Sequence, residues 1–167
     1  MRMLTFDEAS SASLMQSSSS RMDFLLAAVD YMRRDDWLRL LGDEWDSCDI
    51  ITPYKRRLGE YLPRVGPVRQ MMTSYERMMY DQLPDRLTVY RGCGPNNMNG
   101  LSWTLSMDVA VSFPSLIRYY QAHPLLVRAR VKKESILALK LERKESEVIT
   151  FGARRTSATP LSRGEFE

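Results

Sequence analysis

The sequence has little of the side chains on which much enzyme chemistry depends. Its 167 residues include one histidine, His123, and two cysteines, Cys48 and Cys93. A single histidine gives poor support to a Ser-His-Asp hydrolase or to a histidine-bound metal. Two isolated cysteines predict neither a disulfide framework nor a zinc site, and a reducing cytosol is the simplest setting for them. We therefore expect no metal cofactor and a cytoplasmic protein.

Long apolar runs are missing as well. The longest candidate, from Phe24 to Val29, is far shorter than the roughly 20 residues that span a bilayer. Arg2 near the amino terminus is not followed by an apolar stretch before the serines, so a secretory signal is not expected. With 44% hydrophobic and 27% charged residues, the composition is typical of a soluble globular protein. The sequence predicts no association with a membrane.

Charge gives only a weak indication of partners. The net charge of +3 is compatible with an acidic or phosphate-bearing partner without requiring one. Basic residues in the first half are not interleaved with stacking aromatics, which favours a solvated helix face over a nucleic-acid patch. These residues are Lys55, Arg56, Arg57, Arg64 and Arg69. A nucleic-acid partner is therefore not expected.

The length fits one domain behind a short lead-in. Residues 1–20 are rich in serine, whose short polar side chains bury too little to offset the entropy of ordering, and we expect them to be flexible. Residues 21–167 form the single domain in this interpretation. Its first part, 21–84, has helical spacing of apolar residues, whereas 85–152 has the alternation of strands. The fold class predicted is α+β.

Helical spacing predicts three helices in the first part, over about 20–41, 53–62 and 67–83. Ser20 is the expected N-cap of the first, and Pro67 is expected at the first position of the third. A stripe of large side chains runs along the third helix, and we assign it to the core rather than to a binding surface. The stripe comprises Met71, Tyr75, Met78 and Met79.

The second part predicts five strands and one helix. Alternating or short apolar segments indicate strands over 87–91, 101–106, 126–132, 136–141 and 147–151. Between the second and third strands, helical spacing predicts a helix from about 108 to 120, kinked or restarted at Pro114.

Three short motifs in these strands carry polar side chains on one face. Arg91 shares a strand face with two apolar residues and is followed at once by Gly92. A guanidinium is suited to phosphate, and glycine lets a ligand approach the backbone, although for this motif alone a structural ion pair of the arginine is the favoured explanation. Ser102 and Thr104 line one face of the next strand, a pattern that an exposed face also produces.

The third motif is a pair of carboxylates two residues apart. Glu145 and Glu147 share a face that continues into apolar residues, which is less typical of solvated charge, although a charged strand edge remains an alternative. Taken in order, the motifs are Tyr-Arg-Gly, Ser-Trp-Thr and Glu-Ser-Glu. Ala110 and Phe113 follow the serine motif at eight and eleven residues after Ser102.

This order and spacing resembles the arginine–serine–glutamate class of ADP-ribosyltransferases over about residues 83–151. The resemblance implies a helical half packed on a split, mostly antiparallel β-sandwich that binds NAD as co-substrate. Thr104 and Trp103 stand where the family usually has Ser and Thr, and the loop between the first two motifs is short.

The resemblance also implies roles for the residues. Glu147 stabilises the oxocarbenium-like ribose as nicotinamide leaves, and Ser102 holds Glu147 in place. Arg91 binds the NAD phosphate or ribose, and the backbone of Gly92 pairs with the nicotinamide carboxamide. Glu145 orients or deprotonates the acceptor. By position, the resemblance adds a second group of NAD-binding residues, namely Trp103, Thr104 and Phe113.

The activity implied is mono-ADP-ribosyl transfer to a protein, by a monomer similar to the small effectors of phages and bacteria that inactivate a host or defence protein. Two alternatives stay open. One is an NAD glycohydrolase, with water as the acceptor, and the other is a non-catalytic protein that keeps the fold and acts by binding. The sequence does not identify the target protein.

Overall fold

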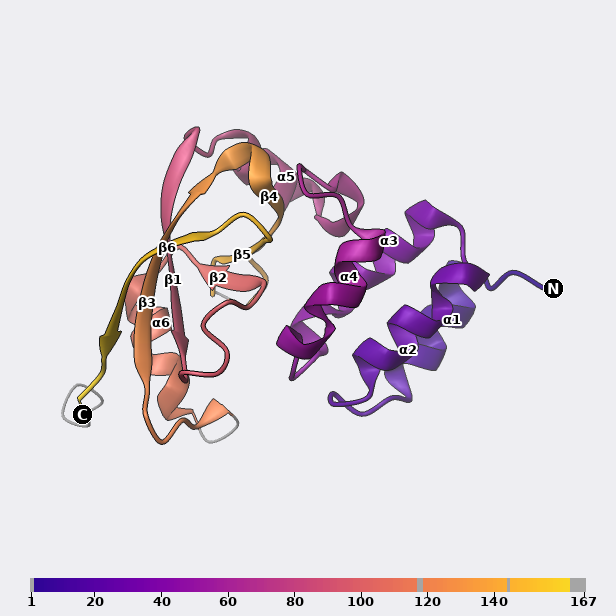
Figure 1. Cartoon of the computed structure of the whole chain (residues 1–167). Helices are drawn as coiled ribbons and strands as arrows, with labels where there is room; N and C mark the ends of the chain where they lie inside the picture. The colour runs from indigo at the N-terminus through magenta and orange to yellow at the C-terminus, as the bar shows by residue number, and fades with distance from the viewer. Residues whose placement is uncertain (1, 117–118, 144, 163–167) are drawn as a thin grey trace.

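The computed structural model describes residues 2–116, 119–143 and 145–162, which form an α+β fold with six α-helices and a six-stranded antiparallel sheet. Figure 1 shows α1 to α4 gathered at one side and the sheet with α6 at the other. The helices are α1 (Phe6–Leu14), α2 (Arg21–Ala28), α3 (Arg34–Glu44), α4 (Lys55–Tyr61), α5 (Ser74–Asp81) and α6 (Met107–Ser112). We call α1 to α4, with the turns between them, the helical lobe.

Short 3-10 helices extend several of these elements: η1 (Val29–Tyr31), η2 (Trp45–Ser47), η3 (Thr52–Tyr54), η4 (Arg69–Met71), η5 (Phe113–Ser115) and η7 (Lys133–Ser135). The strands are β1 (Arg86–Cys93), β2 (Ser102–Thr104), β3 (Leu125–Lys132), β4 (Ile136–Lys140), β5 (Glu147–Thr150) and β6 (Arg154–Pro160). The α+β class expected from the sequence is therefore confirmed. No helix among the described residues is both long enough and apolar enough to cross a bilayer.

Within the serine-rich segment, which the sequence predicts to be a flexible lead-in, nine residues form α1. α1 begins with a reciprocal capping box, in which the Thr5 hydroxyl accepts from the Glu8 amide and the Glu8 carboxylate accepts from the Thr5 amide. Ala9 and Ser13 are fully buried against the rest of the lobe. Small side chains permit this close packing, so Ala9 and Ser13 help the helix to dock.

The long first helix predicted over 20–41 is broken. After η1, the backbone is extended at Met32, and α3 begins two residues later. Ser20 occupies the predicted N-cap position, but its side chain makes no capping hydrogen bond there. The helix predicted over 53–62 is present as η3 followed by α4.

The prediction that Pro67 begins a helix is wrong. The chain on either side of it is extended along the sheet, where Gly66 and Val68 donate backbone hydrogen bonds to the carbonyls of Glu134 and Leu137, both at 2.8 Å. Helix α5 begins only after Thr73, which forms a second capping box with Glu76.

The methionine stripe is core only in part. Met71 is buried and Met79 is partly buried, whereas Tyr75 and Met78 are 58% and 50% exposed on the outer side of α5. The helix starts several residues later than the spacing predicts, so these two side chains fall on its solvent face.

The sheet has the order β4-β5-β2-β1-β3-β6, and every neighbouring pair is antiparallel. All six strands belong to one sheet, where the sequence predicts a split sandwich. The connection between β1 and β2 consists of one residue pair, Tyr90 with Thr104, so the sheet has two three-stranded parts joined at a narrow point. β6 is absent from the sequence prediction because its residues, all exposed, show no apolar alternation.

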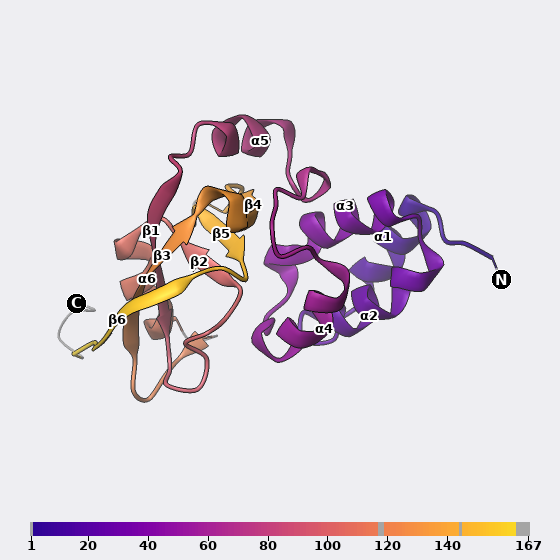
Figure 2. The ribbon, with the colours of Figure 1, turned by 45° about the horizontal axis from the view of Figure 1, so that its top comes forward.

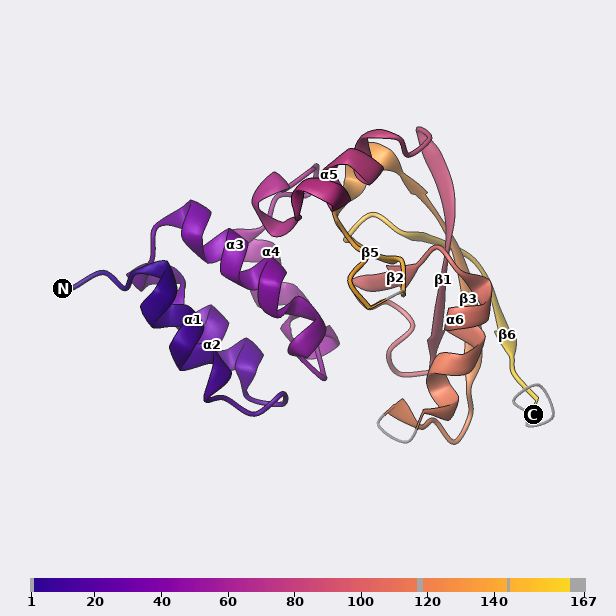
Figure 3. The same cartoon turned by 180° about the vertical axis from the view of Figure 1, so that it is seen from behind.

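Helices cover both faces of this sheet. In Figure 3, α6 lies against β1 on the face turned away from the helical lobe, and it also contacts β2. α6 and η5 cover 107–115; the rest of the helix predicted to 120 includes residues 117–118, which lie outside the described part of the chain. On the opposite face, one continuous core connects the sheet with the lobe.

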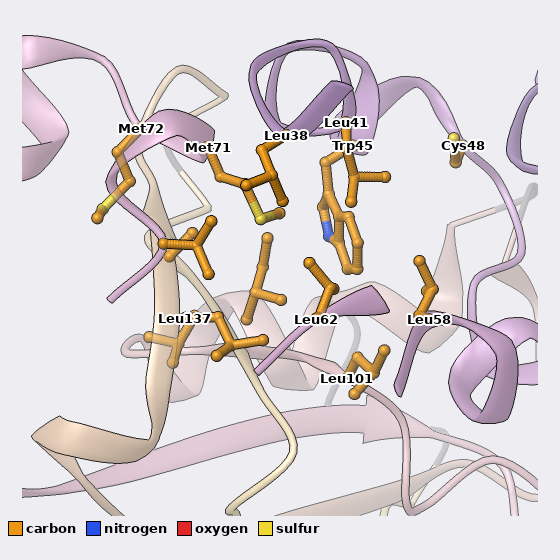
Figure 4. Packing of buried hydrophobic residues seen from close by; sticks show 14 of the residues in the cluster. Leu38, Leu41, Trp45, Cys48, Leu58, Leu62, Met71, Met72, Leu101 and Leu137 are labelled. Atoms are coloured by element: carbon orange, nitrogen blue, oxygen red, sulfur yellow. The ribbon is translucent and has the colours of Figure 1, made fainter. Parts of the chain in front are cut away.

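Figure 4 shows the junction of the lobe and the sheet side, where Trp45, Leu38 and Leu41 face Leu62 and Leu137. Figure 2 shows α5 above this junction, in contact with β4, while η4 contacts α3. The core therefore fixes η2, at the end of α3, relative to the strands that carry the predicted motifs.

Candidate active site

A cavity of about 670 Å3 lies between the segment from η2 to η3 and the ends of β1, β2 and β5. Its volume is within the range of about 300–1,000 Å3 that is common for small-molecule sites. Six of the predicted site residues line it, and they come from four separate elements and a loop: Arg91, Gly92, Ser102, Phe113, Glu145 and Glu147. Trp103 and Thr104 border a smaller pocket beside α6, which the same six residues also line.

Glu147 is held at the centre of a small hydrogen-bond network. Trp45 Nε1 donates to Glu147 Oε1 at 3.0 Å and to Ser102 Oγ at 3.2 Å. The Ser102 hydroxyl also hydrogen-bonds to the Glu147 carboxyl. One carboxyl group is thus oriented from two sides, by a serine on the neighbouring strand and by an indole from the helical lobe.

Burial raises the pKa of Glu147 to about 8. The nearby Asp46 carboxyl, which hydrogen-bonds to Glu147, also raises this pKa, whereas the Ser102 and Trp45 donors lower it. Two carboxyl groups that share a hydrogen bond cannot both be ionised at low cost, so the pair holds a proton near neutral pH.

Arg91 is fixed by neutral acceptors. Its Nε donates to the Asn97 carbonyl at 3.0 Å, Nη1 to the Ser102 carbonyl, and Nη2 to Thr52 Oγ1 at 3.3 Å. Within the described residues no carboxylate forms an ion pair with it. Burial lowers the pKa of Arg91, but a guanidinium stays charged at neutral pH. The cavity wall therefore contains a fixed positive charge. The Glu147 carboxyl interacts with it electrostatically without forming an ion pair, so the charge suits an anionic ligand.

The packing of a helix on β1 also requires glycine at position 92, apart from any approach of a ligand. A Cβ on this residue would lie 1.8 Å from the Ala110 carbonyl oxygen and 2.7 Å from Pro114 Cδ. The absence of a side chain lets α6 and η5 lie directly on β1. The segment that approaches Gly92 closely is therefore a helix. The backbone of Gly92 also borders the cavity.

We expect Gly92→Ala to lower the free energy of unfolding by about 1–3 kcal/mol, since the helix must move away from the strand. Gly59→Ala is the matched control. Its Cβ would meet only the flexible end of Arg64, at 2.9 Å, and alanine favours a helix by up to about 1 kcal/mol. Urea denaturation measures both, and a Gly92→Ala variant as stable as Gly59→Ala would contradict this account of the packing.

Thr104 and Trp103 have structural roles. The Thr104 hydroxyl donates to the Glu145 carbonyl and accepts from the Ser106 amide at 3.0 Å. Trp103 is buried and donates to the Gly100 carbonyl at 3.1 Å. Through these contacts they hold the loops beside the cavity. That they also bind NAD stays a prediction, since both border the smaller pocket that shares residues with the cavity.

Glu145 lies in the loop before β5, so it is not on the strand as the alternation predicts. Ser146, between the two glutamates, has φ of 45°, a left-handed conformation that is uncommon for a residue with a side chain. This turn leaves both glutamates on the cavity wall. Burial and the nearby Asp46 raise the pKa of Glu145, and Arg143 lowers it.

Aromatic side chains border the cavity opposite the helical lobe. Phe113 stacks on Tyr119, with ring centroids 4.4 Å apart and an angle of 20° between the planes. Tyr120 is 62% exposed and also lines the cavity. A planar ligand has apolar surface available here.

Trp45 and Asp46 are the site residues that the sequence analysis missed. They follow α3 in the helical lobe, and Trp45 is 102 positions from its acceptor Glu147. Apolar spacing identifies Trp45 only as a core residue, and no local pattern marks Asp46. Their role depends on the docking of the lobe onto the sheet.

The described residues contain no group of three or more His, Cys, Asp or Glu side chains arranged to hold a metal ion. Comparisons with protein-family models, with curated proteins and with solved structures give no match for this chain.

Proposed function

We propose that the chain is an NAD-dependent mono-ADP-ribosyltransferase that modifies a protein. The observation that carries the proposal is the convergence of Arg91, Ser102 and Glu147, which come from three strands and line one cavity. The three motifs that resemble the arginine–serine–glutamate class are thus neighbours in space as well as ordered along the chain.

The chemistry of each group fits this reaction. The charge of Arg91 and its fixed orientation suit the diphosphate of NAD. A carboxylate at Glu147 would stabilise the positive charge that develops on the ribose as the bond to nicotinamide breaks. Glu145, at the cavity wall, is available to orient the acceptor or to remove its proton.

Incubation of the purified chain with NAD labelled in its ADP-ribose part, with and without a cell lysate, tests the proposal. We expect nicotinamide release and label on a lysate protein. Release of free ADP-ribose alone would favour a glycohydrolase. Absence of nicotinamide release, together with no rise of the melting temperature in millimolar NAD, would overturn the proposal in favour of a binding protein, since a ligand of the folded state must stabilise it.

Trp45 and Asp46 should shift the pH dependence of NAD cleavage in opposite directions. Asp46→Asn removes a neighbouring charge that raises the pKa of Glu147, so the rate should reach its plateau at lower pH. Trp45→Phe removes a donor that favours the carboxylate, so the plateau should move to higher pH. The measurement is the pH profile of nicotinamide release. Equal shifts in both variants would mean that neither acts through Glu147.

A further inference from the structure

The outer face of β1, β3 and β6 gathers basic side chains that are dispersed in the sequence. These strands contain no aspartate or glutamate at all. Their exposed basic residues on this face are Arg86 on β1, Arg128, Arg130 and Lys132 on β3, and Arg154 on β6. Figure 3 shows these strands on the side turned away from the helical lobe, with α6 covering part of the same face. We call these five residues the basic face.

The strand register places like charges directly opposite each other. Arg86 is paired with Lys132, and Arg130 with Arg154. Directly opposed residues in an antiparallel sheet have Cβ atoms about 4.5–5.5 Å apart, and like charges there are destabilising. Folding alone therefore does not favour this arrangement, whereas an anion bound across both strands would stabilise it.

Few contacts within the molecule neutralise the basic face. Lys132 pairs with Glu134 at 3.3 Å, and this is its one ion pair among the described residues. Arg128 lies over the ring of Tyr90, 5.5 Å from the centroid, a contact that keeps its charge. Within the described part of the chain, the guanidinium groups of Arg86, Arg130 and Arg154 form no ion pair.

The surroundings favour nucleic acid over an acidic protein. Protein interfaces have an apolar centre with aromatic anchors. The large apolar side chains that are exposed in the described part of the chain all lie outside β1, β3 and β6. Contacts with a phosphate backbone require no such centre, and they use arginine, lysine and hydroxyl groups. Hydroxyls are present here at Thr88 and Ser157, which are paired with Arg130 and Arg128.

We propose that the basic face binds the phosphodiester backbone of a nucleic acid without base specificity. This surface is separate from the cavity that holds Glu147, and the proposal does not depend on NAD cleavage. The composition of the chain does not predict a nucleic-acid partner, because the basic residues become one patch only through the pairing of β1, β3 and β6.

Fluorescence anisotropy with labelled single-stranded RNA, single-stranded DNA and duplex DNA tests the proposal, over a series of salt concentrations. Binding should weaken as salt increases, with little dependence on base sequence. Arg130→Gln combined with Arg154→Gln removes two phosphate contacts, so the slope of log affinity against log salt for a single strand should become less steep by about 1.4. The melting temperature should not fall, because a pair of like charges is removed.

Arg33→Gln combined with Arg56→Gln is the matched control, since it removes two exposed charges from the helical lobe. This control should retain the salt slope of the unmodified chain. The proposal is overturned if no nucleic acid binds at about 50 mM salt, if the control loses as much affinity as the test variant, or if polyglutamate of equal charge displaces the nucleic acid more effectively than unlabelled strands do. The last result would assign the face to an acidic protein.

Discussion

Glu147→Gln is expected to lower the rate of NAD cleavage by about 100- to 1,000-fold, the usual loss when one group that stabilises transition-state charge is removed. Glutamine has nearly the same shape and can still accept from Trp45 Nε1 and Ser102. What it lacks is the negative charge that would face the ribose. Nicotinamide release under saturating NAD measures the effect. Glu142→Gln, an exposed residue outside the cavity, is the control and should retain full activity.

The pH dependence gives an independent test of the same residue. Because the pKa of Glu147 is raised to about 8, the carboxylate forms only as pH rises through that value, and the rate of cleavage should rise with it. A rate that is already constant between pH 6 and pH 9 would show that ionisation of Glu147 does not control the reaction.

The free energy of unfolding should fall as pH rises, whereas the rate of NAD cleavage should increase. In the unfolded chain this carboxyl has its ordinary pKa of 4.5, whereas the folded protein holds the proton up to about pH 8. The folded state therefore binds more protons in this window, and its stability falls as pH rises from about 4.5 to 8. Glutamine does not ionise, so Glu147→Gln should lack this part of the decrease. A variant that unfolds more readily than the unmodified chain at pH 9 would indicate a structural role for the charge.

The sequence predicts the fold where periodicity and burial coincide. β1 and β3 alternate regularly, and their inner residues Val89, Val127, Ala129 and Val131 are buried as the pattern requires. It misses β6, whose seven exposed residues are ordered by pairing with β3 rather than by burial. α1 is not predicted because the serine content of the segment suggests disorder. The spacing of Thr5 and Glu8, which is typical of a capping box, was the signal for a helix there.

The site was predictable to the extent that it lies on strands. Arg91, Ser102 and Glu147 line one cavity. Alternation and register put Ser102 and Glu147 on the face of Thr104. Arg91 follows Tyr90, the partner of Thr104, so alternation alone does not account for its place in the cavity. The contribution of Trp45 and Asp46 was not predictable, because it depends on how the helical lobe packs against the sheet. The packing role of Gly92 was not predictable either, since the sequence does not show that a helix crosses the strand there.

A buried ion pair between α5 and β4 should have the largest effect on stability. Lys140 and Glu76 are 2% and 1% exposed, and Lys140 Nζ lies 3.1 Å from Glu76 Oε2. Lys140 also donates to the Met71 carbonyl at 3.2 Å. Glu76 accepts from the amides of Thr73 and Leu141 at 2.9 and 2.8 Å. The pair thus connects the cap of α5, the end of η4 and the end of β4. Both charged groups have hydrogen-bond partners in the backbone as well as in each other.

We expect Lys140→Met to lower the free energy of unfolding by about 3–5 kcal/mol, because it leaves a buried carboxylate without its cation. Lys132→Met, at an exposed position on the preceding strand, should change it by no more than about 0.5 kcal/mol. Urea denaturation measures both. Combining Lys140→Met with Glu76→Gln should recover about 1–3 kcal/mol of the loss, since no charge is then left buried. If the losses of the two single variants simply add in the double variant, the two side chains are not coupled, and the ion pair does not hold α5 against β4.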